Sequence, residues 1–425
     1  LTLKNGRPNS YDNGGSVKMD GYHQSNYGNK GHSPLFQNVV FEANQTKHSS
    51  NDAYKEGGAV YAYRSTPFFR DVTFKYNFAA YHGGAITVEG ADTNKTITFE
   101  RTKFIGNYLD PANSPSEDMR GGAVYLAEVG KVIFESSTFD SNYIKINGNC
   151  CTNQGGAIAI NNTYDSLIVR NSKFRYNKVY KPDGNNGGGA EGGAMNISNI
   201  NAHVEITNSL FLGNSAEAAY RNWDGGGGDQ QAQGGAIRIS LQYWSDGNTS
   251  TYPYKSIFIN NTFVDNKAIG SGTNSGYGGA LNYSGNASTV LVNNIFWGNR
   301  SNEASSTDQH NIKFDGGQQL QLNIDYNNIE FSEHVPDIMG SNSYDIDPSF
   351  YSATNYQLSA GSPLIGAGIA TFNGITGPTF DKLENARPNP SGSSPDLGAY
   401  ENSLAESPYP KQVKNLAGIP GSGQV

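Results

Sequence analysis

The sequence predicts an all-β protein that folds as a right-handed parallel β-helix of roughly nine to eleven coils. Two short motifs alternate along the chain, and the second recurs at intervals of 30 to 52 residues. A repeat of that length indicates a solenoid, in which each unit buries its apolar face against its neighbours. The 52 glycines among 425 residues argue against helices, because glycine costs about 1 kcal/mol relative to alanine in a helix interior.

The first motif is Gly-Gly-Ala (GGA) followed by an apolar residue. The residues after it alternate between apolar and mostly polar positions, which predicts a short strand with one face turned inward. Two glycines permit a tight corner with positive φ, and alanine is small enough for a crowded bend. The copies begin at Gly57, Gly83, Gly121, Gly155, Gly192, Gly234 and Gly278.

The second motif is Phe-x-x-Asn, preceded by another alternating run such as KTITFERTKF. Equivalent strands stacked about 4.8 Å apart form parallel sheets, and parallel crossovers are right-handed. We expect the phenylalanines to stack inside the rod and the asparagines to form an amide ladder, since asparagine tolerates left-handed corners. We expect a second amide ladder from asparagines three residues before the phenylalanine. The phenylalanines are Phe41, Phe74, Phe104, Phe139, Phe174, Phe211, Phe263 and Phe296, and the second asparagines are Asn171, Asn208, Asn260 and Asn293.

Charge and hydropathy disfavour several classes of partner. The formal net charge is −8, and without a cluster of Lys or Arg the chain is a poor partner for nucleic acid or an anionic membrane. No stretch approaches the roughly 20 apolar residues of a membrane span. The chain begins at Leu1 without a signal peptide, so we expect a processed or partial chain. The two cysteines, Cys150 and Cys151, are neighbours, which favours free or locally paired thiols over a disulfide framework or a metal site.

The alternating GGA[ILV] and Phe-x-x-Asn repeats cover about residues 10–300. They resemble those of the chlamydial polymorphic outer-membrane adhesins and of many bacterial β-helix repeat proteins of the pectate-lyase-like superfamily. The resemblance implies a secreted or bacterial cell-surface location. It leaves the activity open, because this fold carries lyases, hydrolases, adhesins and passenger domains alike.

The C-terminal part carries further resemblances. DIDPSFYSATNYQLSAGSPLIGAG and ARPNPSGSSPDLGAYE are similar to the closing module of secreted β-helix proteins with a separate sorting tail, a group that includes type IX-secreted proteins. The usual aspartate of SPLIDAG is Gly366 here. The last residues, PYPKQVKNLAGIPGSGQV, resemble the opening strand of a fibronectin type III domain. These resemblances predict a β-helix over 1–360, a closing module packed on it over 361–403, and a linker with the start of a fibronectin type III-like domain over 404–425.

The strands offer little for catalysis. Stacked coils bring equivalent outward residues close together, which is how hydrolases pair two carboxylates and how lyases combine acids, Ca²⁺ and a base. The outward columns after GGA contain no adjacent carboxylates, and Glu89 and Arg238 are isolated in them. We therefore expect no catalytic residue on the strands.

The long connections between Phe-x-x-Asn and the next GGA are expected to emerge from one side of the rod. Their acids, cations and aromatics suit stacking on a sugar and hydrogen bonding to it, although ordinary solvated loops have the same composition. Asp224 and Asp229 flank a glycine run and are weak candidates for a structural Ca²⁺, because dense Asp-x-Asp spacing is missing. The candidate ligand-binding residues are Asp110, Asp118, Arg120, Tyr180, Lys181, Asp183, Glu191, Tyr220, Arg221, Trp223 and Asp224.

The favoured hypothesis is a non-catalytic extracellular or cell-surface module, adhesin-like or a structural stalk, that binds a glycan on the loop-bearing side. Its expected partners are an extracellular glycan, a host or neighbouring cell surface, and further domains of the same polypeptide, with calcium as the one candidate cofactor. The alternative is a polysaccharide lyase or glycoside hydrolase that uses loop carboxylates with Lys181, Arg221 or Arg120. A third hypothesis is end-to-end self-association, because the N-terminal stretch shows no amphipathic cap.

Overall fold

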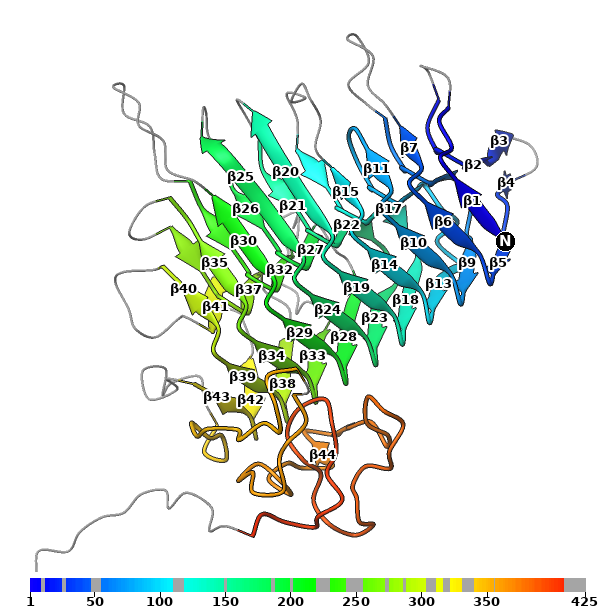
Figure 1. Ribbon diagram of the computed structural model, residues 1–425. Coiled ribbons are helices and arrows are strands. Elements are labelled where there is room, and N and C mark those ends of the chain that lie inside the picture. The colour runs from blue at the N-terminus through cyan, green and yellow to red at the C-terminus, as the bar shows by residue number, and fades with distance from the viewer. Residues whose placement is uncertain are drawn as a thin grey trace, which may run out of the picture.

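The computed structural model shows a right-handed parallel β-helix, in which successive coils stack along a rod (Figure 1). Within the described residues there is no α-helix. In the same ranges no helix is long and apolar enough to cross a membrane. The described residues are 1–8, 12–24, 28–46, 55–109, 118–148, 151–184, 188–198, 202–218, 230–241, 255–271, 275–285, 288–302, 311–315, 322–330, 340–354 and 356–408.

The GGA motif begins the strands of one sheet, which we call the GGA sheet. The predicted corner is confirmed: Gly83 has a φ of +58°, and a Cβ on Gly84 would lie 2.0 Å from the carbonyl oxygen of Gly122 in the next coil. Ala85 is fully buried beside them. The described strands are β2 (Val17–Asp20), β8 (Val60–Tyr63), β12 (Ile86–Glu89), β17 (Val124–Val129), β22 (Ile158–Thr163), β27 (Met195–Ser198), β32 (Ile237–Ser240), β37 (Leu281–Ser284) and β41 (Ile312–Asp315).

The motif phenylalanines lie in a second sheet, the Phe sheet, and form the predicted stack. The centroids of successive rings are 4.7–5.0 Å apart from Phe41 to Phe296. The described strands are β1 (Thr2–Lys4), β6 (Val40–Glu42), β10 (Thr73–Lys75), β14 (Lys103–Ile105), β19 (Thr138–Asp140), β24 (Lys173–Arg175), β29 (Leu210–Leu212), β34 (Thr262–Val264), β39 (Ile295–Trp297) and β43 (Asn328–Ile329).

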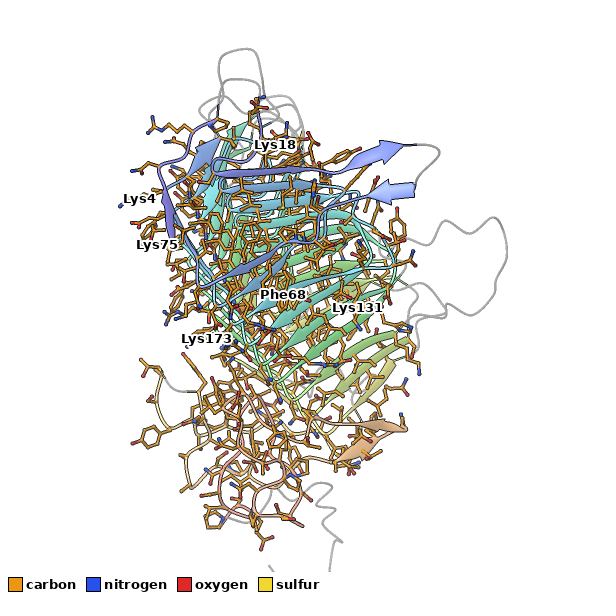
Figure 2. The ribbon with its side chains drawn as sticks, turned by 90° about the vertical axis from the view of Figure 1, so that its right-hand side faces the viewer. Lys4, Lys18, Phe68, Lys75, Lys131 and Lys173 are labelled. Carbon is orange, nitrogen blue, oxygen red and sulfur yellow. The ribbon has the colours of Figure 1, made fainter. Side chains whose placement is uncertain are left out.

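A third sheet, the middle sheet, comes after the GGA sheet and before the Phe sheet along each coil, and the three sheets together enclose the apolar core. It adds a second ring stack of Phe36, Phe69, Phe99 and Phe134 that the sequence analysis did not foresee. Figure 2 shows Phe68 and Lys131 of this sheet away from the edge where Lys4, Lys75 and Lys173 of the Phe sheet lie. The described strands are β5 (Leu35–Gln37), β9 (Phe68–Arg70), β13 (Thr96–Glu100), β18 (Lys131–Glu135), β23 (Ser166–Arg170), β28 (His203–Thr207), β33 (Lys255–Ile259), β38 (Ser288–Val292) and β42 (Leu322–Asp325).

After the Phe sheet the chain leaves the core and returns as an arm of two sheets. Between these sheets lie small apolar clusters of their own, such as Leu109, Met119 and Ile144. The outgoing strands are β7 (Gln45–Thr46), β11 (Phe78–Ala79), β15 (Tyr108–Leu109), β20 (Tyr143–Gly148), β25 (Lys178–Gly184), β30 (Ser215–Ala218), β35 (Lys267–Ile269) and β40 (Arg300–Ser301). The returning strands are β16 (Met119–Arg120), β21 (Asn153–Gln154), β26 (Ala190–Glu191), β31 (Ala232–Gln233) and β36 (Gly276–Tyr277).

The long connections do not all lie on the arm side. β32 ends at Ser240 and β33 begins at Lys255, so the connection between these strands joins the GGA sheet to the middle sheet. The expectation that every long excursion precedes a GGA corner is therefore wrong at this coil. A short antiparallel pair, β3 (Tyr22–Gln24) and β4 (Gly28–Lys30), connects the same two sheets in the first coil.

The amide ladder of the Phe-x-x-Asn motif is confirmed. The Nδ2 of Asn142 donates to the Oδ1 of Asn177 at 2.9 Å and to the carbonyl oxygen of Phe104 at 3.0 Å. The same pattern runs from Asn44 to Asn299, with every side chain buried. Each amide therefore ties one coil to the coils on both sides.

The second ladder lies one residue later than predicted. Asn171, Asn208, Asn260 and Asn293 have φ between 48° and 57°, and this left-handed corner places the following residue inside. There the backbone N–H of Ser209 donates to Asn261 Oδ1 at 2.9 Å, and the N–H of Asn261 donates to Asn294 Oδ1 at 2.9 Å. The inner positions are Thr102, Ser137, Ser172, Ser209, Asn261, Asn294 and Asn327.

An irregular C-terminal segment, residues 340–408, packs against the outside of the last coils (Figure 1). It covers Leu212 and Val264 of the Phe sheet, and Val290 and Val292 of the middle sheet. Its one short hairpin pairs β44 (Thr371–Phe372) with β45 (Ile375–Thr376). The domain boundaries at residues 360 and 403 stay predictions, and residues 409–425, with most of the predicted fibronectin-like strand, lie outside the described part.

Three of the left-handed corner asparagines, Asn208, Asn260 and Asn293, hydrogen-bond to this segment. The Nδ2 of Asn208 donates to the carbonyl oxygen of Phe380 at 2.6 Å, and that of Asn260 donates to the oxygen of Asp396 at 3.0 Å. The Nδ2 of Asn293 donates to the carbonyl oxygen of Ile369 at 2.8 Å, and its Oδ1 accepts the backbone N–H of Ile369 at 3.0 Å. Inside the segment the guanidinium of Arg387 lies 2.9 Å from the carboxylate of Glu401, and both side chains are fully enclosed.

Candidate functional site

The returning arm strands meet the GGA sheet at the Gly-Gly corners, and we call this junction along the rod the elbow. The residue before each GGA, the corner column, lies on the same side as the second residue of the following strand, the strand column. Although strand-column residues face outward from the core, Thr87, Tyr125, Asn196 and Asn282 are buried, because the arm covers them. The corner column is Glu56, His82, Arg120, Gln154, Glu191, Gln233 and Tyr277, and the strand column is Tyr61, Thr87, Tyr125, Ala159, Asn196, Arg238 and Asn282.

A continuous hydrogen-bonded track runs through the centre of the elbow. Arg120 lies 3.0 Å from Asp118 Oδ2 and donates through Nε to Gln154 Oε1 at 2.9 Å. Gln154 donates to Glu191 Oε2 at 3.1 Å, and Asn196 donates to the same oxygen at 2.9 Å. Charged and amide groups from three successive coils therefore share one network.

The N-terminal end of the elbow is acidic. Burial and the nearby charge of Glu89 raise the pKa of Glu56 well above its usual value, and Arg120 opposes this shift. Burial likewise raises the pKa of Glu89, whose Oε2 accepts a hydrogen bond from the Tyr61 hydroxyl at 3.0 Å. The charge of Glu89 therefore acts on Glu56 of the corner column, although no neighbouring carboxylate stands beside Glu89 in its own outward column.

His82 occupies the next corner position and is fully enclosed. Its Nδ1 accepts the backbone N–H of Arg120 at 3.2 Å, and its ring packs on Tyr81 and Tyr125. Burial, followed by the Arg120 charge, holds the pKa of His82 well below its usual range. The imidazole is therefore neutral near pH 7 and acts as an acceptor in the wall of the elbow.

The C-terminal end of the elbow holds a buried cation. Arg238 donates through Nη1 to the carbonyl oxygen of Ile239 at 2.6 Å. Burial lowers the pKa of Arg238, and the charges of Glu191 and Asp315 oppose that shift. Lys313 lies two coils beyond, 5.8 Å from the Tyr277 ring centroid and 3.9 Å from Asp315 Oδ1. The C-terminal end of the elbow therefore carries cations together with a carboxylate, whereas the N-terminal end is acidic.

Several buried polar atoms of the elbow have no hydrogen-bond partner among the described residues. They are Glu56 Oε2, Asn196 Oδ1, Gln233 Oε1, Arg238 Nε and Asn282 Oδ1. Buried polar groups are nearly always paired in folded proteins, because leaving one unpaired costs about 1–3 kcal/mol. Such a row of free donors and acceptors is a physical reason to place a polar ligand here.

The structure brings only some of the predicted ligand-binding residues together. Asp118, Arg120 and Glu191 share the elbow track. Lys181 lies between the two arm sheets, where its Nζ donates to the carbonyl oxygen of Cys151 at 3.0 Å and burial lowers its pKa. Tyr180, its neighbour in β25, lies on the opposite face of the arm, with Lys178 Nζ 4.5 Å from its ring centroid.

The remaining predictions fall outside what the structure describes. Asp183 belongs to β25, but its side chain is not described. The residues outside the described ranges are Asp110, Tyr220, Arg221, Trp223, Asp224 and Asp229. Within the described ranges, no three His, Cys, Asp or Glu side chains gather as a metal site would require, and the calcium site stays a prediction.

Sequence reasoning missed the corner column as a unit. The signal was present, since each member immediately precedes a GGA and five of the seven are Glu, Gln or Arg at equivalent steps. Local pairing, one of the two expectations for the thiols, agrees with the structure: Cys151 is disulfide-bonded, and Cys150, the chain's other cysteine, lies outside the described residues.

Residues 71–89 match the model of the Chlamydia polymorphic membrane protein (Chlamydia_PMP) repeat. The matched stretch includes one copy of each motif, Phe74 to Asn77 and Gly83 to Ala85. No curated protein matches the chain. Together with the all-parallel solenoid, the repeat supports a β-helix surface protein of adhesin-like kind.

Proposed function

We propose that this protein is a non-catalytic extracellular or cell-surface β-helix module that binds a glycan along the elbow. The observation that supports this most is the track from Asp118 through Arg120 and Gln154 to Glu191, flanked by buried donors and acceptors without partners. Sugar hydroxyls both donate and accept, so they complement a mixed row of amides, carboxylates and guanidinium groups.

The repeat itself favours a polymer as the ligand. The corner and strand columns carry a polar pair in every coil except that of Gln154, where the strand column holds Ala159, and the coils are spaced about 4.8 Å apart. An extended ligand with regularly placed hydroxyl groups meets several such pairs at once, and the contacts of neighbouring coils then act together. A surface-bound glycan on a host or neighbouring cell is such a ligand, which agrees with an adhesin-like role.

Catalysis is the second candidate, because Glu56 and Glu89 form an acidic pair with raised pKa values. Glu56, however, is only 9% exposed. A general acid must reach the oxygen that it protonates, and this burial argues against cleavage. The proposal also includes three expected partners of the module. They are further domains of the same polypeptide, a structural Ca²⁺ on the arm-side loops, and a second rod associated end to end.

The test is a panel of acidic and neutral polysaccharides, incubated with the purified chain with and without Ca²⁺. Binding is measured by retardation of the protein in gels that contain each polymer. Cleavage is measured by new reducing ends and by the ultraviolet absorbance of unsaturated products. We expect at least one polymer to bind and none to be cleaved; cleavage of any polymer would replace this proposal by the enzymatic one.

A matched pair of variants locates the binding. Arg120→Ala removes the centre of the track, whereas Arg101→Ala removes an exposed arginine that pairs with Asp71 at 2.7 Å on a corner of the core. We expect Arg120→Ala to weaken binding about tenfold or more and Arg101→Ala to leave it unchanged. Equal binding by both variants would show that the elbow is not the site.

A further inference from the structure

A cleft of about 520 Å³ lies between the middle sheet and the C-terminal segment, on a different side of the rod from the elbow. Its floor is formed by the ends of β23, β28 and β33, and its other wall is formed by residues 375–380. The volume falls within the range of about 300–1,000 Å³ that is common for small-molecule sites. The cleft exists only because the C-terminal segment stands over the sheet.

The wall of the cleft is partly apolar. Ile257 and Ile259 of β33 face Ile375, Pro378 and Phe380 of the C-terminal segment. The position of Ile259 holds Glu100, Glu135 and Arg170 in earlier coils, whereas the position of Ile257 already holds Ile133 and Ile168. The apolar surface therefore suits the carbon-bearing face of a small ligand.

The polar groups of the cleft carry no net charge. Arg170 donates through Nε to Glu205 Oε1 at 2.9 Å, and its Nη2 lies 2.8 Å from the same oxygen. The charges of Arg170 and Glu205 compensate each other at the rim of the cleft, so no unpaired charge is left in this pair to attract an anion or a cation. The cleft is accordingly suited to a neutral ligand.

Two side-chain oxygens at the cleft are unsatisfied. Asn208 is 3% exposed, and its Nδ2 is fixed by the bond to Phe380. The Nδ2 of Asn171 is fixed by a bond to Glu135 Oε1 at 2.9 Å. These bonds set the amide orientations, and the Oδ1 of each is buried with no donor in the described part of the chain. The two oxygens lie in adjacent coils, so a single ligand with two hydrogen-bond donors would satisfy both.

We propose that this cleft binds a neutral saccharide of one or two units. Such a molecule offers several hydroxyl donors to the amide oxygens of Asn171 and Asn208 and an apolar C–H face to Ile257 and Ile259. It has no charge that would disturb the Arg170–Glu205 pair. The inference does not rest on glycan binding at the elbow, because it uses a different surface and a different set of residues.

The probes are methyl α-glucoside, methyl α-mannoside, methyl α-galactoside and N-acetylglucosamine, each measured by saturation-transfer difference NMR on the full chain. Gly377 provides a matched pair of variants. A Cβ there would have its nearest neighbours, Ala370 O and Asn260 Oδ1, at 3.6 Å and Ile259 Cγ2 at 3.7 Å, so Gly377→Ala fits without strain and Gly377→Phe fills the cleft. We expect one or more of the probes to give transfer with the wild type and with Gly377→Ala, and a loss of about tenfold or more in affinity with Gly377→Phe.

A second variant covers the case in which Gly377→Phe disturbs folding. Asn171→Gly removes one of the two unsatisfied oxygens, suits the local φ of 51° and keeps the bond from Asn208 to Phe380 that holds the cleft wall. We expect Asn171→Gly to weaken binding of the same saccharide, while Arg120→Ala does not. Absence of transfer from all four probes with the wild type would overturn the inference, as would transfer that survives in both Gly377→Phe and Asn171→Gly. Loss in Arg120→Ala instead would assign the saccharide to the elbow. Polysaccharide binding at the elbow is measured separately by gel retardation, so its failure and the failure of this inference are distinguishable.

Discussion

The ring of Tyr76 lies over Gly106, which occupies the equivalent corner of the next coil. A Cβ on Gly106 would be 2.9 Å from Cδ1 of that ring, and a Cβ on Gly213 would be 2.8 Å from Cδ1 of Tyr176. Both tyrosines are more than half exposed. A ring that covers a neighbouring glycine protects backbone that would otherwise face water, so these exposed tyrosines have a structural explanation.

Gly106→Ala should therefore destabilise the rod for two reasons. Gly106 has a φ of +57°, which strains any residue with a Cβ by about 1 kcal/mol, and the new methyl group also meets the Tyr76 ring. Gly374→Ala is the matched control, because its φ of +76° brings the same strain with nothing within 4 Å. Chemical unfolding should show a larger loss of unfolding free energy for Gly106→Ala than for Gly374→Ala. Equal losses would show that the Tyr76 ring does not contribute to the effect.

Asn142→Ala should be among the most damaging substitutions in the chain. It removes the acceptor of the Asn107 backbone N–H at 3.0 Å and of the Asn107 side chain at 2.9 Å, inside a fully buried ladder. Because each buried donor left unpaired costs about 1–3 kcal/mol, we expect a loss of about 3 kcal/mol or more. Asn94→Ala, at an exposed turn, should stay within about 0.5 kcal/mol, and similar midpoints for the two variants would contradict the ladder's energetic role.

Asn260→Gly should loosen the C-terminal segment without unfolding the rod. It keeps a residue suited to a φ of 54° but deletes the hydrogen bonds to Asp396 and Gly398. Hydrogen exchange should accelerate in residues 362–401 and stay slow in the Phe sheet. Exchange that accelerates in both regions equally would show that the segment and the last coils unfold as one unit.

The attachment of the C-terminal segment should also depend on pH. Burial raises the pKa of Asp396 to about 6 and that of Glu401 to about 7, and Arg387 opposes both shifts. A carboxyl whose pKa is raised by folding stabilises the folded state below its unfolded value, and this stabilisation is lost as the pH rises through the folded value. Stability contributed by these two groups should therefore fall between about pH 4 and pH 7.

Lys382 acts in the opposite direction at higher pH. Its amine is buried against Asn171, and burial lowers its pKa to about 7. The cost of enclosing its charge is therefore relieved as the pH rises from about 7 toward 10. Hydrogen exchange of the segment at pH 5, 7 and 9 should show least protection near pH 7, and Asp396→Asn should flatten the acidic side. A profile in which Asp396→Asn follows the wild type would contradict this assignment.

Much of the fold was predictable because its determinants repeat locally. Gly-Gly-Ala marks a corner whose geometry depends on a few adjacent residues, and the stacked phenylalanines follow from period-two alternation. The second ladder was placed one residue too early, at Asn171 and its equivalents, because asparagine suits both a left-handed corner and an internal ladder. Only the observed φ decides between those two uses, and it turns the side chains of Asn208, Asn260 and Asn293 toward the C-terminal segment.

The candidate site was less predictable, because it joins columns that the sequence separates. Glu191 meets Asn196 of its own corner and, through Gln154 of the preceding coil, Arg120 of the coil before that. The sequence by itself determined the coil, its corners and the inner rings, since each depends on residues that recur at fixed spacing. The tertiary structure alone decided the elbow and the cleft over β33, because both arise where the chain folds back over an outward face, and outward positions carry no periodic signal of what will cover them.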